Sequence, residues 1–312
     1  MRGTPRVIIT QAVFPETLGL LTPYAEVIVG APARDADALM VFMSDSLDEE
    51  FLRECPRLKI VAAALKGYDN FDVEACTRLG IWFTIVPDLL TEPTAELALG
   101  LMLGLARNVP AGDRLIRSGK FDGWRPVLYG TGLGASVVGL IGFGAVGRAL
   151  ARMLKALSCR VEYHDPAVEG STPLDIVLAT SDFVLPLLPL NEGTLHLIDR
   201  EALGRMKPGA YLINVSRGSV VDEEAVADAL EAGKLAGYAA DTFEMEDWAR
   251  RDRPLEINSR LLRMPDRTLF TPHLGSAVAE ARRGIERAAA GNILQALRGE
   301  RPAGAINNPK GR

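Results

Sequence analysis

The chain has 312 residues, of which 48% are apolar and 24% charged, and its formal net charge at pH 7 is −5. This length exceeds that of a usual single domain, so we expect two domains, each with a sizeable core. The negative net charge argues against a nucleic-acid partner, because proteins that bind nucleic acids usually carry a basic face. A local cluster of Arg and Lys can still bind a small anion. The apolar run LALGLMLGLA (97–106) is too short to span a membrane.

The cysteines and the N-terminus indicate the cellular compartment. Cys55, Cys76 and Cys159 form no CxxC pair, so neither a disulfide framework nor a cysteine metal site is expected. The first residues, MRGTPRVIIT, lack the long apolar segment and the small-residue cleavage site of a signal peptide. We therefore expect a cytoplasmic protein without a membrane partner and without a metal.

Short apolar segments alternate with helix-like ones in the first third of the chain. The predicted strands are RVIIT (6–10), ALMVFM (38–43), LKIVAAA (58–64) and IWFTIV (81–86). A helix is predicted at 46–55, which begins with acidic residues, and another within 87–108, where Pro93 suits a first turn. This alternation predicts a parallel sheet with helices on both faces.

A polar connector, 117–135, leads to a second α/β unit that starts at Val137. Its further strands are predicted at RVEYHD (160–165), DFVLPLLP (182–189), AYLINVS (210–216), GYAADTF (237–243) and the start of TLFTPHLGS (268–276). A long helical pattern follows at 277–299.

Three glycines stand between an apolar strand pattern and a helix pattern in VVGLIGFGAVGRALARMLKAL. Gly142 permits a tight turn, Gly144 lets the backbone approach a pyrophosphate, and Gly147 lets the helix pack on the strand. The N–H groups at the start of that helix favour phosphates. Asp165, at the end of RVEYHD, can accept hydrogen bonds from the adenosine ribose and would repel a 2′-phosphate. NAD is therefore favoured over NADP, although the nearby Arg160 can reverse that preference.

The acid–base group must be sought among three histidines. His164 stands beside Asp165 at the adenosine end, and His196, in GTLHLID, is interpreted as a surface or capping residue. His273 follows a strand-like run. Because ligand sites in open α/β sheets lie beyond the carboxyl ends of strands, His273 is the candidate base.

Two further charged residues follow strand-like runs. Arg217 either holds a substrate oxyanion through two hydrogen bonds or forms a surface ion pair. Glu246 is either the partner that orients the imidazole of His273 or a solvated loop acid.

The motifs GFGAVG, NVSRGSVVDEEAV, GYAADTFEMED and TPHLGS occur together in this order. They resemble the D-isomer-specific 2-hydroxyacid dehydrogenase family over nearly the whole chain. The resemblance implies two doubly wound α/β domains with a cleft between them. A Rossmann NAD-binding domain, 99–276, would be inserted in a flavodoxin-like catalytic domain made of 1–98 and 277–312. It also implies a homodimer.

The resemblance assigns residues as well as folds. It implies a catalytic triad of Arg217, Glu246 and His273. The cofactor-binding residues that it implies are Gly142, Gly144, Ala145, Val146, Gly147, Asp165, Pro189, Thr194, Val215, Asp241 and Gly275.

Several segments, including ALKGYDNFDVEAC and FEMEDWARRDRP, resemble the phosphonate (phosphite) dehydrogenases of this family. Relatives typically have a Gly-rich anchor loop where this chain has ALKGYDN, so Lys66 adds a cation. The substrate-binding residues that this resemblance implies are Lys66, Gly67, Met43, Arg282, Trp124 and Tyr129. The two aromatic residues are candidates to come from a partner subunit. The alternatives are that Lys66 caps a turn, that Met43 lies in the core and that the aromatic residues pack in the connector.

The sequence therefore favours NAD-dependent oxidation of phosphite to phosphate, with His273 or Arg217 activating a water molecule. The alternative keeps these residues for a 2-hydroxy or 2-keto acid and NAD or NADP. A third hypothesis is a nucleotide-sensing protein without catalysis. The span 165–182 looks shorter than the family pattern, as if a helix–strand excursion were missing. This leaves the adenine contacts and the choice between NAD and NADP open.

Overall fold

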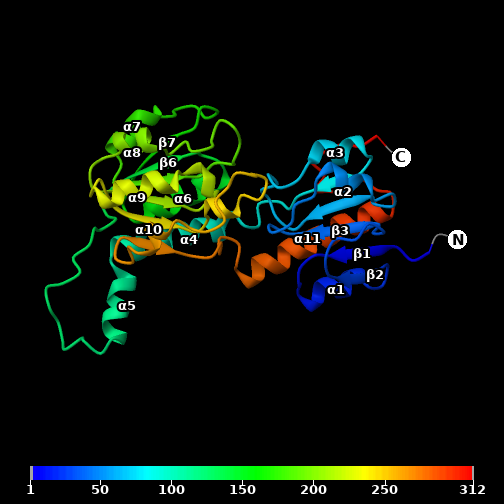
Figure 1. Cartoon of the computed structure of the whole chain (residues 1–312), viewed down its shortest axis with the longest axis horizontal. Coiled ribbons are helices and arrows are strands. Elements are labelled where there is room, and N and C mark those ends of the chain that lie inside the picture. The colour runs from blue at the N-terminus through cyan, green and yellow to red at the C-terminus, as the bar shows by residue number, and fades with distance from the viewer. Residues whose placement is uncertain (1–2, 311–312) are drawn as a thin grey trace. The chain divides into compact units, whose positions relative to one another are not determined.

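The computed structural model describes residues 3–310, and the chain forms two compact units (Figure 1). The first unit combines the chain up to Leu90 with the chain from Val278, and the second is Thr91–Ala277. The division expected from the sequence placed the first boundary after residue 98. That position falls inside the helix α4 (Thr91–Ala106), all of which belongs to the second unit.

The first unit contains a five-stranded sheet in the order β2-β1-β3-β4-β5, with all neighbours parallel. Its strands are β1 (Arg6–Ile9), β2 (Glu26–Val29), β3 (Ala38–Val41), β4 (Ile60–Ala63) and β5 (Trp82–Thr84). The sequence analysis omitted β2, which lies at the sheet edge and has no fully buried residue, so its apolar signal is weak.

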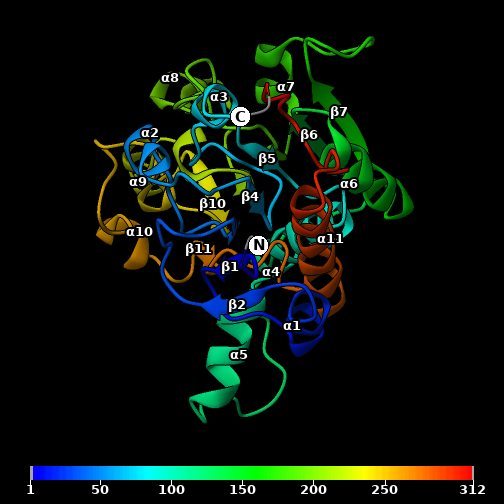
Figure 2. The same ribbon diagram turned by 90° about the vertical axis from the view of Figure 1, so that its right-hand side faces the viewer.

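In the described part of the first unit, four helices accompany this sheet. They are α1 (Pro15–Leu21), α2 (Glu49–Arg53), α3 (Val73–Arg78) and α11 (Ala279–Leu297). The helix α11 packs on β3 and β4 and lies beside α1, as Figure 2 shows. α2 and α3 each begin after an aspartate, Asp48 or Asp72, whose carboxylate accepts a backbone N–H of the first turn. α2 and α11 confirm the helices expected at 46–55 and 277–299.

The second unit contains a six-stranded parallel sheet in the order β11-β10-β9-β8-β6-β7. Its strands are β6 (Val137–Ile141), β7 (Arg160–His164), β8 (Phe183–Pro186), β9 (Ala210–Asn214), β10 (Leu235–Ala240) and β11 (Thr268–Phe270). The chain adds β7 on one side of β6 and β8 on the other, so the strand order reverses there. Such a switch point is where doubly wound sheets bind dinucleotides.

The second unit has seven α-helices and two 3-10 turns among its described residues. They are α4, α5 (Val109–Arg117), α6 (Ala145–Ala156), α7 (Leu174–Thr180), α8 (Arg200–Arg205), η1 (Gly218–Val220), α9 (Glu223–Glu231), η2 (Glu244–Glu246) and α10 (Ser259–Leu262). α4 packs on α6 and on β9, β10 and β11. Of the described helices, none is long and apolar enough to cross a membrane.

The segment between β7 and β8 contains only the helix α7 and no strand, as its short sequence predicts. β7 is consequently the edge of the sheet. The loop after β7 folds back on this edge, where the Thr172 N–H donates to the Tyr163 carbonyl (2.8 Å) and the Tyr163 hydroxyl donates to the Glu169 carbonyl (2.8 Å). The loop therefore covers the edge that a further strand would otherwise occupy.

Candidate active site

The candidate site of the second unit lies at the carboxyl edge of its sheet. Because all six strands are parallel, the segments that follow them begin at the same edge. The glycine loop 142–147 follows β6, and Asp165 follows β7. Arg217, Glu246 and His273 come after the neighbouring strands β9, β10 and β11. The fold thus places the predicted triad and the predicted dinucleotide loop on one edge.

The glycine loop has the shape that a phosphate requires. Gly142 has a φ of +97°, and a Cβ there would lie 2.5 Å from the Leu187 carbonyl oxygen. A Cβ on Gly147 would lie 2.7 Å from the Gly142 carbonyl oxygen, so α6 packs against the turn only with glycine there. At Gly144 a Cβ would meet nothing within 4 Å, and no side chain caps α6. The open helix start therefore fits a dinucleotide pyrophosphate.

Asp165, which is predicted to lie at the adenosine end, is held by two backbone N–H groups. Its Oδ2 accepts the Phe143 N–H (2.8 Å) and its Oδ1 accepts the Ala167 N–H (3.0 Å). These backbone hydrogen bonds lower the pKa of Asp165. Arg160, which could have reversed the preference for NAD, donates instead to the Glu162 carboxylate (2.5 Å). The ionised Asp165 is therefore suited to ribose hydroxyls.

The other predicted cofactor residues line the same edge. The Thr194 hydroxyl donates to the Pro189 carbonyl (2.7 Å), which closes the loop after β8. Val215 is buried directly after β9, and Ala145 and Val146 form the first turn of α6. They stay candidates for cofactor binding.

Asp241 organises the loop that carries His273. Its Oδ1 accepts the Thr271 hydroxyl and the Leu274 N–H, both at 2.6 Å, and its Oδ2 accepts the Gly275 N–H (2.9 Å). The residue is 1% exposed, and this burial raises the pKa of Asp241 while the hydrogen bonds oppose the change. Both carboxylate oxygens thus fix the loop that carries His273, and Asp241 stays a candidate for cofactor binding.

His273 and Glu246 form a half-buried pair. The imidazole Nδ1 lies 2.7 Å from Glu246 Oε2, while Glu246 Oε1 accepts the Phe243 N–H (2.9 Å). Because the carboxylate only accepts, Nδ1 carries the proton and Nε2 is left for proton transfer. The backbone of His273 has a φ of 56°, a left-handed conformation held by its N–H donating to the Asp241 carbonyl (2.9 Å). This pair can act as a general acid–base.

The turn η1, which follows Arg217, packs against the turn η2, which carries Glu246. A Cβ on Gly218 would lie 1.9 Å from the Phe243 carbonyl carbon, so only glycine lets η1 pack against the start of η2. The Asn214 side-chain amide donates to the Arg217 carbonyl (2.8 Å), and Arg217 Nη1 donates to the Ser216 carbonyl (2.9 Å). The turn η1, which follows Arg217, is therefore in direct contact with the turn η2, which ends at Glu246.

Four of the predicted substrate residues, Lys66, Gly67, Met43 and Arg282, lie in the first unit, whereas the exposed Trp124 and Tyr129 lie in the second. Lys66 forms an ion pair with Asp88, so its charge already has a partner, and Gly67 follows it in the loop. Met43 is partly buried against the core, and its carbonyl accepts the Asn70 side-chain amide (2.8 Å).

Arg282 lies near the start of α11 and turns towards the same loop. Its Nη1 donates to the Ala64 carbonyl (3.3 Å), and its guanidinium lies 5.5 Å from the centre of the Phe42 ring. Burial lowers the pKa of Arg282. The guanidinium therefore supports the backbone just before Lys66, which suits a cation that acts near this loop.

The sequence analysis missed a second histidine–glutamate pair beside the triad. His196 Nε2 lies 2.9 Å from Oε2 of Glu244, a residue only 7% exposed. The His196 side chain is 34% exposed, as a surface position implies, but its ring is paired with a buried carboxylate. The neighbouring Arg250, also missed, joins this pair (3.2 Å to Glu244 Oε2). The one signal in the sequence was the spacing of Glu244 and Glu246 in FEMED, which places two carboxylates on one turn with different partners.

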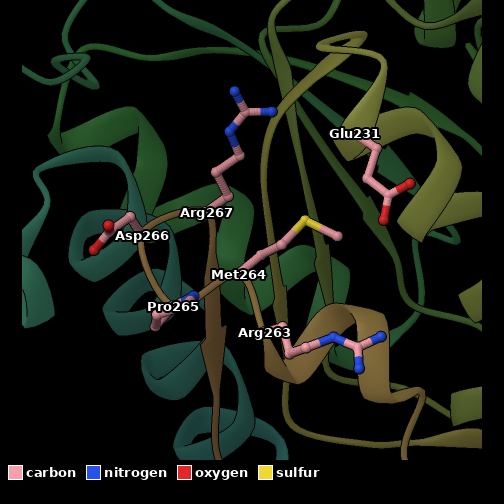
Figure 3. A pocket seen from close by; sticks show the side chains of 6 residues that line it. All are labelled: Glu231, Arg263, Met264, Pro265, Asp266 and Arg267. Atoms are coloured by element: carbon pink, nitrogen blue, oxygen red, sulfur yellow. The ribbon is translucent and has the colours of Figure 1, made fainter.

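A cavity of about 340 Å³ lies elsewhere in the second unit (Figure 3). Its lining residues are Glu231, Arg263, Met264, Pro265, Asp266 and Arg267. Five of them immediately precede β11, so the cavity is at the amino edge of the sheet, opposite the triad. It contains no predicted site residue. Within residues 3–310 no group of three or more His, Cys, Asp or Glu residues could hold a metal ion.

Residues 99–275 match the family described as "D-isomer specific 2-hydroxyacid dehydrogenase, NAD binding domain". The chain belongs to this family. It is 37% identical to the glyoxylate reductase of Pyrococcus furiosus, over 97% of this chain and 95% of that protein. This confirms the family that the motifs indicated, and the two parallel α/β domains confirm the expected fold class.

Solved structures agree with this assignment. The TT0316 protein of Thermus thermophilus has a TM-score of 0.88 and 33% identity, over 96% of this chain and 99% of that one. The NADPH-dependent glyoxylate/hydroxypyruvate reductase of Sinorhizobium meliloti, in complex with NADP and malonate, has a TM-score of 0.85 and 28% identity, over 97% of both chains.

The chain is therefore a dehydrogenase with an NAD(P)-binding domain, of the D-2-hydroxyacid type. The Pyrococcus and Sinorhizobium proteins are named for the reduction of glyoxylate and not for the oxidation of phosphite. The comparisons thus support the alternative drawn from the sequence better than its first hypothesis.

Proposed function

We propose that this protein reduces glyoxylate to glycolate, and related small 2-keto acids to the corresponding D-2-hydroxy acids, with NADH or NADPH. The observation that carries the proposal is the His273–Glu246 pair, joined through η1 and η2 to Arg217, at the edge that also bears the dinucleotide loop. The names of the Pyrococcus and Sinorhizobium relatives support the same substrate class.

The residues divide the chemistry between them. A nicotinamide cofactor, when bound, would supply the hydride for the carbonyl carbon. Arg217 binds the substrate carboxylate, because a guanidinium matches its two oxygens. His273 donates the proton from Nε2 to the keto oxygen, and Glu246 orients the ring and stabilises its charged form. A positioned acid of this kind contributes about 10²- to 10⁴-fold in rate.

The first-unit residues belong to the proposal as substrate-binding groups. We propose that Lys66 exchanges its ion pair with Asp88 for the substrate anion, and that Arg282, Gly67 and Met43 support this loop. A Lys66→Ala variant is then expected to raise the KM for the keto acid about tenfold, the usual effect of removing one charge-assisted contact. The KM for the cofactor is expected to stay within twofold.

Phosphite oxidation is the second candidate. It is favoured by the segments that resemble phosphonate dehydrogenases and by Lys66, a second cation that suits a dianion. Steady-state assays of glyoxylate, hydroxypyruvate, lactate, glycerate and phosphite with both cofactors separate the candidates. Turnover of keto acids without phosphite turnover supports the main proposal. Turnover of phosphite alone overturns it in favour of the second, and activity with none of these substrates overturns both.

A homodimer belongs to the proposal as well. The helix α5 has no buried residue and projects with its following loop away from the rest of its unit (Figure 1). Large apolar side chains are exposed along it: Val109 by 58%, Ile116 by 54%, Phe121 by 51%, Trp124 by 81% and Tyr129 by 79%. A second copy of this chain is the partner that the family resemblance implies for this arm.

The dimer is tested by light scattering after gel filtration. We expect the mass of two chains for the wild type and of one chain when Ile116, Phe121 and Trp124 are all changed to Ser. A monomeric wild type would contradict the dimer. We also propose that the protein works in the cytoplasm, where its free thiols Cys55, Cys76 and Cys159 stay reduced.

A further inference from the structure

The turn η2 carries two glutamates that face two different histidines. Glu246 pairs with His273, and Glu244, two residues earlier, pairs with His196. Of the two glutamates, Glu244 is the more deeply placed: its side chain is 9% exposed, against 25% for Glu246. A buried carboxylate needs several partners to offset its desolvation.

Arg250 is the partner that joins the two turns. Its Nη1 donates to the Ser219 hydroxyl in η1 (2.7 Å) and to Glu244 Oε2 in η2 (3.2 Å). Its other nitrogens bind Asp252 (3.1 and 3.3 Å), which orients the guanidinium. The Arg250 side chain is 17% exposed, so these charge-assisted hydrogen bonds are partly shielded from water.

Two further contacts fasten the same turns. The His196 N–H donates to the Ser219 carbonyl (2.7 Å), while its ring reaches Glu244. The Asp247 carboxylate accepts the Ser219 N–H (2.7 Å). Each polar group of Ser219 thus meets a residue of this network. η1 directly follows Arg217, and η2 ends at Glu246, so the network fixes the two segments that carry them.

We infer that Arg250 is a positioning residue, which holds Arg217 and the His273–Glu246 pair in register by clamping η1 to η2. The inference rests on the proposed function of those three residues. It follows from two contacts made by one guanidinium nitrogen, one on each turn. A displacement of about 1 Å between catalytic groups can cost about a hundredfold in rate, so a clamp at this place has a measurable kinetic effect.

The test compares Arg250→Met with Arg260→Met. Arg260 is a matched control, because it also binds several carboxylates in this unit, Asp228 and Glu231 among them, yet touches neither η1 nor η2. We expect Arg250→Met to lower kcat for glyoxylate about tenfold to a hundredfold, with the KM for NADH within twofold. Arg250→Lys is expected to restore part of the loss, and Arg260→Met to keep the wild-type kcat.

A second readout is independent of turnover. The ring ¹⁵N shifts of His273 report whether Nδ1 or Nε2 carries the proton, and with three histidines in the chain the spectrum is readily assigned. We expect Arg250→Met, but not Arg260→Met, to move these shifts towards a mixture of tautomers. If Arg250→Met matches the control in both kcat and ring shifts, the inference is overturned.

The two proposals fail in different ways. If the wild type turns over no substrate of the panel, the proposed function fails, and the ring shifts alone decide whether Arg250 positions His273. If Arg250→Met does not fold, Ser219→Ala takes its place, because it removes only the η1 contact of Arg250. An unchanged kcat and unchanged ring shifts in Ser219→Ala would then contradict the clamp.

Discussion

The two histidine–glutamate pairs of the second unit are nearly alike in their own geometry. Their nitrogen–oxygen distances are 2.7 Å for His273 and 2.9 Å for His196, and the two histidine side chains are 31% and 34% exposed. Both histidines have left-handed backbones, with φ of 56° and 50°. Their glutamates, Glu246 and Glu244, come from the same turn.

The surroundings of the two glutamates differ. Glu246 has one further partner, the Phe243 N–H, whereas Glu244 also accepts from Arg250 and from the Glu223 N–H (3.1 Å). The charge of Glu244 is therefore shared with a guanidinium, and that of Glu246 acts mainly on its histidine. This difference predicts proton transfer for the His273–Glu246 pair and the fixing of a turn for the His196–Glu244 pair.

The largest expected difference between the pairs is in the loss of the histidine. His273→Asn removes the proton donor, so we expect kcat for the keto acid to fall by at least about a hundredfold, the usual contribution of a general acid. His196→Asn leaves the donor in place and is expected to lower kcat less than about tenfold. Steady-state oxidation of NADH measures both. Equal losses in the two variants would remove the distinction between the pairs.

Loss of the glutamates is also expected to have different effects: Glu246 on catalysis and Glu244 on stability. Glu246→Gln allows the wrong tautomer of His273, so kcat should fall about tenfold to a hundredfold with little change in Tm. Glu244→Gln leaves Arg250 without its buried counter-charge and should cost about 1–3 kcal/mol of unfolding free energy. Thermal melts alongside kinetics test this. A Glu246→Gln variant with full activity would show that another group orients His273.

The buried residue Glu223, which lies beside Glu244, also predicts that the free energy of unfolding depends on pH. Burial raises the pKa of Glu223 from 4.5 to about 7, because the hydrogen bonds from the Glu244 and Asn258 N–H groups only partly oppose the desolvation. The nearby charges of Glu244 and Asp247 raise it further. The folded protein thus binds this proton more tightly than the unfolded chain.

The free energy of unfolding should therefore decrease as the pH rises from about 4.5 to about 7, by up to about 3 kcal/mol from this group. Glu223→Gln removes the titrating group and should flatten that slope. Denaturant titrations at pH 5 and pH 8 measure the difference. If the wild type and the variant show the same slope, Glu223 is ionised in the folded protein throughout this range.

The smallest expected effect concerns the adenosine end. Asp165→Ala removes the carboxylate that would repel a 2′-phosphate, so the preference for NADH over NADPH should fall about tenfold, as the loss of one charge-assisted contact implies. The ratio of kcat/KM for the two cofactors measures it. A ratio that does not change would mean that Asp165 does not contact the ribose.

Local patterns were sufficient for the elements with a strong signal. The glycine loop, the buried strands of both sheets and the long helix α11 have clear apolar periodicity or fixed backbone requirements, and all were predicted. β2 was not predicted, because an exposed edge strand has only a weak apolar pattern. Arg217, Glu246 and His273 could be singled out because each comes soon after a strand or a strand-like run, and their role as a triad stays a prediction.

The network behind the triad could not be predicted in this way. Arg250, Ser219 and His196 are brought together only by the packing of η1 against η2, which depends on Gly218. The hydrogen bonds of Asp241 could not be predicted either, because their donors lie in a loop thirty residues further along the chain. Sequence spacing indicates which edge of a sheet a residue reaches but not which neighbours it meets there.

A double-mutant cycle on Glu246 and His273 tests the central claim most directly. If the carboxylate acts only through the imidazole, the kcat of Glu246→Gln/His273→Asn for glyoxylate should equal that of His273→Asn alone. A double variant slower than His273→Asn by the full factor of the Glu246→Gln single variant would contradict the account. The two residues would then act independently, and the pair would not be the acid–base unit of this enzyme.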